Sequence, residues 1–134
     1  MFLVYINDIV DVVNSEIRLF ADDTTVFVFV DNPVASARKL NNDLSKMNDW
    51  VNQWLVNFSH PKTKCMTISW TKRKVPHPPL EMGGIVIDEV DHFKHLSVTI
   101  QDDLSWDKHV SNIIIKANKK LDIMLSLKYK LDRA

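Results

Sequence analysis

The chain has 134 residues, 46% of them hydrophobic, which is enough for one domain with a buried core. Its 17 lysine and arginine residues balance 17 aspartate and glutamate residues, so the chain has no overall positive charge that could attract nucleic acid. The single cysteine, Cys65, excludes an internal disulfide and is expected to be a small buried residue in a strand.

The first predicted element is a short buried helix over residues 2–13. Its apolar start, residues 1–6, is interrupted by Asn7 and Asp8, so it is too short for a signal peptide or a membrane span. We therefore expect an intracellular chain, in nucleus or cytoplasm, that has no membrane partner.

A β-hairpin is predicted next, over residues 17–30. Two apolar, β-prone runs flank the pair Asp22-Asp23, which should lie at or beside the tip of the hairpin. Two adjacent like charges repel, so the pair suggests a bound cation, and Mg²⁺ prefers one or two carboxylates. Ordinary turn chemistry is the alternative, because Asp is common in turns.

An amphipathic helix should follow, with Asn32 as its N-cap and Pro33 at its first position. Apolar residues recur at three- and four-residue spacing, and the polar residues between them, Asp43 included, are expected to form the opposite face. We expect this helix to pack on the face of the sheet that carries the hairpin. The apolar positions are Ala37, Leu40, Leu44, Met47, Val51, Trp54 and Phe58.

Short strands and a second long helix are predicted in the remainder. The strands cover residues 64–69, 85–87 and 95–100, with an exposed linker at 72–79 and a turn at Gly83-Gly84. Ser105 is expected to cap the second helix, whose apolar stripe is Val110, Ile114, Ala117, Leu121 and Met124.

Three polar groups in this part have competing interpretations. Asp102-Asp103 is explained by turn chemistry and by the helix that follows. A zinc site at Asp91, His92 and His95 is less favoured than a strand and turn, because no second Cys/His pair exists. The basic residues Lys62, Lys64, Lys72, Arg73 and Lys74, with Trp70 among them, suit either a phosphate backbone or a solvated loop.

Several blocks, in order along the whole chain, resemble the reverse transcriptases of non-LTR, LINE-like retrotransposons. They match the C-terminal part of the palm and the start of the thumb. The blocks are FLVYIND at 2–8, LFADDTT at 19–25, WVNQWL at 50–55, KTK at 62–64, HLSV at 95–98 and LSWDKHV at 104–110.

The resemblance implies an α+β fold. Residues 1–100 would form a partial polymerase palm, an antiparallel sheet with the Asp22-Asp23 hairpin and helices packed on one face. Residues 101–134 would begin the thumb with a thumb-like helix.

The resemblance also implies RNA-directed DNA polymerase activity by two-metal nucleotidyl transfer. Its partners would be an RNA template, a DNA primer and a deoxynucleoside triphosphate, and its cofactor Mg²⁺, with Mn²⁺ as a substitute. Asp22 is the implied metal ligand and Asp23 its less direct neighbour, while Lys62 lies near the nucleotide. The turn His95-Leu96-Ser97 would support the primer end, although the family usually has glycine at the position of Ser97.

The family's site also needs an aspartate and a glycine segment that these residues do not include. The resemblance therefore implies that this fragment alone is inactive. Half a palm would expose apolar surface on residues 1–6 and the hairpin, from which we expect self-association. The alternative is a non-catalytic remnant that serves as a protein- or RNA-interaction module.

Overall fold

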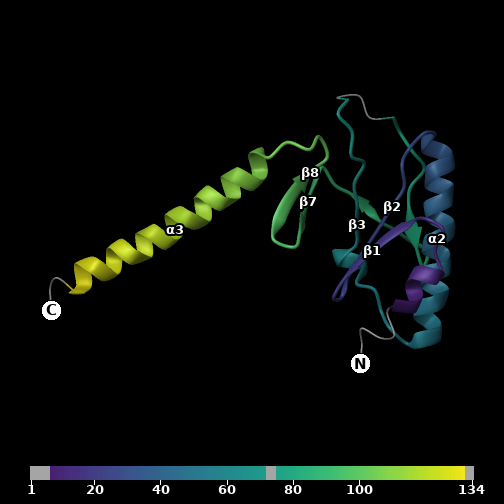
Figure 1. Ribbon diagram of the computed structural model, residues 1–134, viewed down its shortest axis with the longest axis horizontal. Helices are drawn as coiled ribbons and strands as arrows, with labels where there is room; N and C mark the ends of the chain where they lie inside the picture. Colours follow the sequence, from purple (N-terminus) through teal and green to yellow (C-terminus); the bar gives the residue numbers. More distant parts are fainter. Residues whose placement is uncertain (1–6, 72–74, 132–134) are drawn as a thin grey trace. The chain divides into compact units, whose positions relative to one another are not determined.

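The computed structural model describes residues 7–71 and 75–131 and has an α+β fold with long helices and short strands (Figure 1). The chain divides into two compact units, which we describe one at a time. One comprises Met1–Cys65 and Arg73–Glu89, and the other comprises Met66–Lys72 and Val90–Ala134. The predicted division into a palm up to residue 100 and a thumb beyond it stays a prediction.

The first unit begins with a short helix and the expected hairpin. The 3-10 helix η1 (Asn7–Asp11) places Ile9 in the core with no exposed surface. Strands β1 (Glu16–Phe20) and β2 (Asp23–Phe27) then pair antiparallel. The prediction of a helix over 2–13 is thus confirmed only in part, because residues 12–13 lie beyond η1 and residues 2–6 lie outside the described residues.

Helix α2 (Pro33–Trp54) starts as predicted. The Asn32 side chain accepts hydrogen bonds from the backbone N–H groups of Val34 and Ala35, at 3.0 and 3.1 Å. The helix ends earlier than predicted, because Leu55 takes a left-handed conformation (φ 54°) that breaks the repeat. Phe58 therefore lies beyond the helix.

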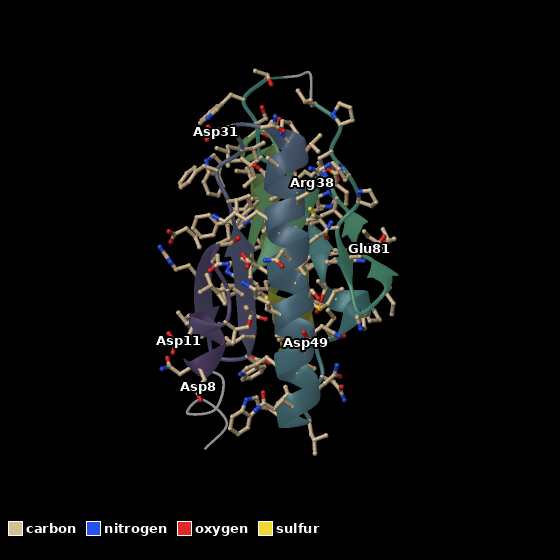
Figure 2. The ribbon with its side chains drawn as sticks, turned by 90° about the vertical axis from the view of Figure 1, so that its right-hand side faces the viewer. Asp8, Asp11, Asp31, Arg38, Asp49 and Glu81 are labelled. Atoms are coloured by element: carbon tan, nitrogen blue, oxygen red, sulfur yellow. The ribbon has the colours of Figure 1, made fainter. Side chains whose placement is uncertain are left out.

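The core of the first unit is built around α2. Ala37, Leu44, Met47 and Val51 are buried as predicted. They pack in one cluster with apolar side chains from the neighbouring elements, Ile9, Ile17, Leu80 and Met82 among them. In Figure 2, α2 faces the viewer with Arg38 and Asp49 on it, Asp8 and Asp11 of η1 to one side, and Glu81 to the other.

Asp43 corrects the predicted polar face of this helix. Its side chain has no exposed surface, although it was expected among the solvent-facing residues. It lies three positions after Leu40 and four before Met47, so the helix turn places it beside the apolar stripe.

The strands after α2 are much shorter than predicted. The 3-10 helix η2 (His60–Lys62) leads into β3 (Lys64–Cys65), which pairs in parallel with β6 (Asp88–Glu89). Strands β4 (Glu81–Met82) and β5 (Ile85–Val86) form a small hairpin around Gly83-Gly84, where both glycines have positive φ. Cys65 is half-buried, and its burial raises the pKa of its thiol, as does the negative charge of Glu89.

The described strands form separate two-stranded ladders, so the predicted antiparallel sheet is found only as small antiparallel pairs that do not join. One ladder, β3 with β6, is parallel. Strands β3, β4, β5 and β6 have only two residues each, fewer than ordinary sheet strands have, and so offer little backbone for a further strand to pair with. The α+β class itself is confirmed.

The second unit contains a hairpin and a helix. Strands β7 (His92–His95) and β8 (Val98–Gln101) pair antiparallel, so the strand predicted over 95–100 is in fact two strands joined by a turn. Helix α3 (Asp107–Leu131) begins two residues after Ser105, which therefore does not cap it. Among the described helices, none is long and apolar enough to span a bilayer.

Candidate functional site

The tip of the β1–β2 hairpin is a tight two-residue loop. Phe20 pairs with Asp23, so Ala21 and Asp22 form the loop and Asp23 begins β2. Ala21 has a φ of 53°, a left-handed value that two-residue hairpin loops require and that usually selects glycine. The hairpin thus confirms the predicted position of both acids at its tip, and it presents both exposed to solvent.

Both carboxylates are free of protein partners within the described residues, where neither the Asp22 nor the Asp23 side chain has a hydrogen bond or ion pair. The nearby cation Arg18 is engaged elsewhere. Its Nη1 donates to the Ile17 carbonyl at 2.8 Å and to Glu16 Oε2 at 3.3 Å, and its guanidinium lies 5.6 Å from the centre of the Phe27 ring. The acidic pair is therefore open to an external cation.

The two carboxylates are suitable Mg²⁺ ligands, but they are too few to form a complete site. Magnesium is commonly held by one or two carboxylates, with waters and substrate phosphates completing its ligands. In the described part of the chain no group of three or more His, Cys, Asp or Glu side chains could hold a metal. The tip could thus hold an ion only with ligands from outside this part.

Lys62 lies in η2 with an exposed side chain, and its backbone N–H donates to the Ser59 carbonyl at 3.0 Å. No contact in the structure joins Lys62 to Asp22 or Asp23, so its role near the nucleotide stays a prediction. Its neighbour Lys64 is occupied, because its Nζ lies 2.6 Å from Asp88 Oδ2.

The structure does not test the other members of the predicted basic patch as a site. Residues 72–74 lie outside the described residues, and the Trp70 side chain is 83% exposed. The solvated-loop interpretation and a phosphate contact therefore both stay open.

The turn at His95-Leu96-Ser97 joins β7 to β8. Its loop residues Leu96 and Ser97 have φ values of 47° and 73°. Positive φ at both loop positions is the pattern of a type I′ turn, which favours glycine or asparagine. The structure explains why glycine would suit the position of Ser97, while the role of this turn beside a primer stays a prediction.

The two competing acidic groups have structural roles. Asp91 Oδ2 accepts from Lys108 Nζ at 2.6 Å and its Oδ1 lies 2.6 Å from His92 Nδ1. Lys108 above all holds the pKa of the Asp91 carboxyl well below its usual range. His95 lies three positions after His92 in the same strand, so the two side chains point to opposite faces and do not converge on one metal.

Asp103 accepts a hydrogen bond from the Ser105 backbone N–H at 2.8 Å. This bond is the main cause of the lowered pKa of its carboxyl. The turn interpretation of this acidic pair is therefore confirmed at Asp103.

Two residues of α2 matter more than the sequence suggested. Asp43 accepts hydrogen bonds from the segment that leads into β1, and Asn41 pairs with the backbone at Pro79 and Glu81. The sequence did contain a signal for Asp43, because it lies three positions after Leu40 and four before Met47, two positions of the apolar repeat.

The chain is similar to the RNA-directed DNA polymerase from mobile element jockey of Drosophila melanogaster, with 26% identity over 97 residues. The aligned residues make up 72% of this chain and 10% of that polymerase, so the chain spans about a tenth of its relative's length. No family model and no solved structure matches the chain. The similarity confirms the resemblance to reverse transcriptases of non-LTR, LINE-like elements.

Proposed function

We propose that these residues form part of a reverse transcriptase domain that carries out RNA-directed DNA synthesis by two-metal nucleotidyl transfer. The observation that carries the proposal is the exposed hairpin tip, where Asp22 and Asp23 have no cationic partner among the described residues, in a chain similar to an RNA-directed DNA polymerase. Asp22 would be a direct metal ligand and Asp23 its neighbour. When bound, Mg²⁺ or Mn²⁺ would supply the positive charge that activates a hydroxyl and stabilises the leaving pyrophosphate.

The remaining roles belong to the same proposal. The partners are an RNA template, a DNA primer and a deoxynucleoside triphosphate, at an intracellular site. Lys62 would offset negative charge on the pyrophosphate, and the turn at His95-Leu96-Ser97 would support the primer end. The second catalytic aspartate and the glycine segment of the family lie outside these residues, so the fragment alone should be inactive.

Metal binding at the tip can be tested by titrating MnCl₂ into the ¹⁵N-labelled chain and recording amide line widths. We expect the amides of Asp22, Asp23 and Thr24 to broaden first, and Asp22→Asn to remove this preference. Asp49→Asn, a change to an exposed acid on α2, is the matched control and should leave the broadening as it is. Equal broadening at acids across the whole surface would contradict the proposal.

Activity can be tested by primer extension with two proteins. The isolated chain should show no synthesis, and Mg²⁺-dependent synthesis by it would disprove the inactivity of the fragment. The jockey polymerase with its aligned segment replaced by this one should extend a primer and lose that activity with Asp22→Asn. Equal synthesis by this hybrid and its Asp22→Asn variant would rule out the metal-ligand role.

The exposed apolar side chains along α3 favour a second candidate, a non-catalytic remnant that binds protein or RNA. Binding of an RNA oligonucleotide that is unchanged by EDTA and by Asp22→Asn would support this alternative.

Self-association through apolar side chains of the hairpin, such as Phe20, which is 61% exposed, also stays a prediction. A monomer in light scattering would contradict it.

A further inference from the structure

Asp43 is a buried carboxylate in the middle of a helix, and the proposed chemistry does not use it. Its side chain has no exposed surface. A buried charge is costly unless it is well hydrogen-bonded, and an apolar residue at this position would normally give a more stable core. The position of Asp43 therefore calls for a role other than core packing.

The partners of Asp43 lie 28 and 29 residues away, in the segment that leads into β1. The backbone N–H of Asn14 donates to Oδ1 at 3.1 Å, and that of Ser15 donates to Oδ2 at 2.8 Å. The Ser15 hydroxyl donates to Oδ2 as well, and Lys46 Nζ lies 3.7 Å from Oδ1. One carboxylate of α2 thus holds two consecutive backbone N–H groups just before the hairpin.

Both oxygens are needed for this arrangement, because the two N–H groups bond to different ones. Only a carboxylate offers two acceptors in this geometry, since an asparagine would turn an N–H donor toward one of them. Burial raises the pKa of Asp43, but the hydrogen bonds from Ser15 and Asn14 and the charge of Lys46 outweigh burial and lower it. The group is therefore held in its charged, doubly accepting form.

The segment bonded to Asp43 is the base of the hairpin. Ser15 directly precedes β1, and the ladder runs without interruption from Glu16↔Phe27 to Phe20↔Asp23. At about 3.3 Å per residue, the tip lies on the order of 20 Å from Ser15. A tilt of about 10° at the base would move the tip by about 3 Å, whereas a catalytic group must be placed to within about 0.5 Å.

We propose that Asp43 is a positioning residue, which orients the β1–β2 hairpin on α2 and so sets the location of Asp22 and Asp23. It acts through the backbone of Asn14 and Ser15 and does not touch a substrate or metal. The catalytic consequence rests on the proposed function, while the orientation itself does not.

The test compares the ¹⁵N-labelled chain with Asp43→Asn, Ser15→Ala and Asp49→Asn. In Asp43→Asn we expect the Asn14 and Ser15 amides to exchange at least about tenfold faster. Residual dipolar couplings of β1 and β2 should no longer fit the wild-type orientation relative to α2. Ser15→Ala removes one of the bonds and should change both measurements less, and it keeps the test valid if Asp43→Asn does not fold. Asp49→Asn, the same change at an exposed acid of α2, is the matched control and should match the wild type.

A paramagnetic measurement separates positioning from a general structural role. With Mn²⁺ at the tip, Asp43→Asn should keep the wild-type affinity while the broadening of α2 amides changes in pattern. Wild-type exchange rates or wild-type couplings in Asp43→Asn would overturn the proposal. If Mn²⁺ does not bind the wild-type tip, the proposed metal site is contradicted. The exchange rates and dipolar couplings still decide whether Asp43 orients the hairpin.

Discussion

Helix α2 and helix α3 both repeat apolar residues at three- and four-residue spacing, but only α2 buries them. In α2 the positions Ala37, Leu44, Met47 and Val51 are all buried. In α3 every residue from 110 to 128 is exposed, including Leu121 at 53% and Met124 at 67%. The spacing therefore predicts a helix with an apolar stripe, whereas burial depends on whether another element covers that stripe.

The sharpest test of this contrast replaces one leucine in each helix. Leu44→Ala should lower the free energy of unfolding by about 2–5 kcal/mol, because it leaves a cavity in the core. Leu121→Ala, the matched change on α3, should alter it by less than about 0.5 kcal/mol. Urea denaturation followed by circular dichroism measures both, and equal losses would mean that the stripe of α3 is covered in solution.

The buried carboxylate of α2 should make the stability of the first unit sensitive to acid. The folded-state pKa of Asp43 lies below its ordinary value of 3.8, so its stabilising effect is complete above that value and is lost as the pH falls through the folded pKa. Asp43→Asn should cost about 1–3 kcal/mol at pH 7.

The check is a series of urea midpoints from pH 7 to pH 2.5 for the wild type and Asp43→Asn. The gap between the two proteins should narrow only below about pH 4. A gap that stays constant over the whole range would show that the ionised form of Asp43 is not what stabilises the fold.

The first turn of α3 is attached to the β7–β8 hairpin, and this attachment can be broken separately. The Thr99 backbone N–H donates to His109 Nδ1 at 3.1 Å, and Thr99 is only 5% exposed. His109→Ala leaves this buried donor unpaired and should cost about 1 kcal/mol.

The rate of hydrogen exchange at the Thr99 amide in His109→Ala measures how much protection the lost hydrogen bond gave. Asn118→Ala, on the exposed part of α3, is the control. The amides of α2 should not respond to either change. Unaltered protection of Thr99 in His109→Ala would show that this bond contributes nothing.

The smallest expected effect is at the β7–β8 turn. Ser97 has a φ of 73°, which costs an L-residue about 1–2 kcal/mol, and glycine relieves this strain but loses about 0.5–1 kcal/mol in chain entropy. Ser97→Gly should therefore stabilise the hairpin by up to about 1 kcal/mol. Slower amide exchange in β7 and β8 would confirm the gain, and faster exchange would contradict it.

Local signals in the sequence predicted local structure well. The Asn32-Pro33 start of α2, the acidic hairpin and the Gly83-Gly84 turn all depend on neighbouring residues, and all three are confirmed. The end of α2 was missed, because Leu55 adopts a left-handed cap without a glycine. The resemblance to reverse transcriptases was also recognised from the sequence alone.

Features that depend on distant residues were harder to predict. The parallel pairing of Lys64-Cys65 with Asp88-Glu89 joins segments more than twenty residues apart. The burial of Asp43 depends on Asn14 and Ser15, which no local pattern connects to α2. For the candidate site, the tip was predicted correctly, while its metal and its partners stay untested.

The path of the chain between the two units has a practical consequence. The segment Met66–Lys72 belongs to the second unit, although the chain on both sides of it belongs to the first. The Ser69 backbone N–H donates to the Asp102 carbonyl at 2.8 Å, which ties this segment to residues beyond position 100. No single cut can therefore yield either unit intact, and a truncation after residue 100 would remove the acceptor of Ser69. Genetic dissection of this chain will need internal deletions or circular permutation in place of simple shortening from one end.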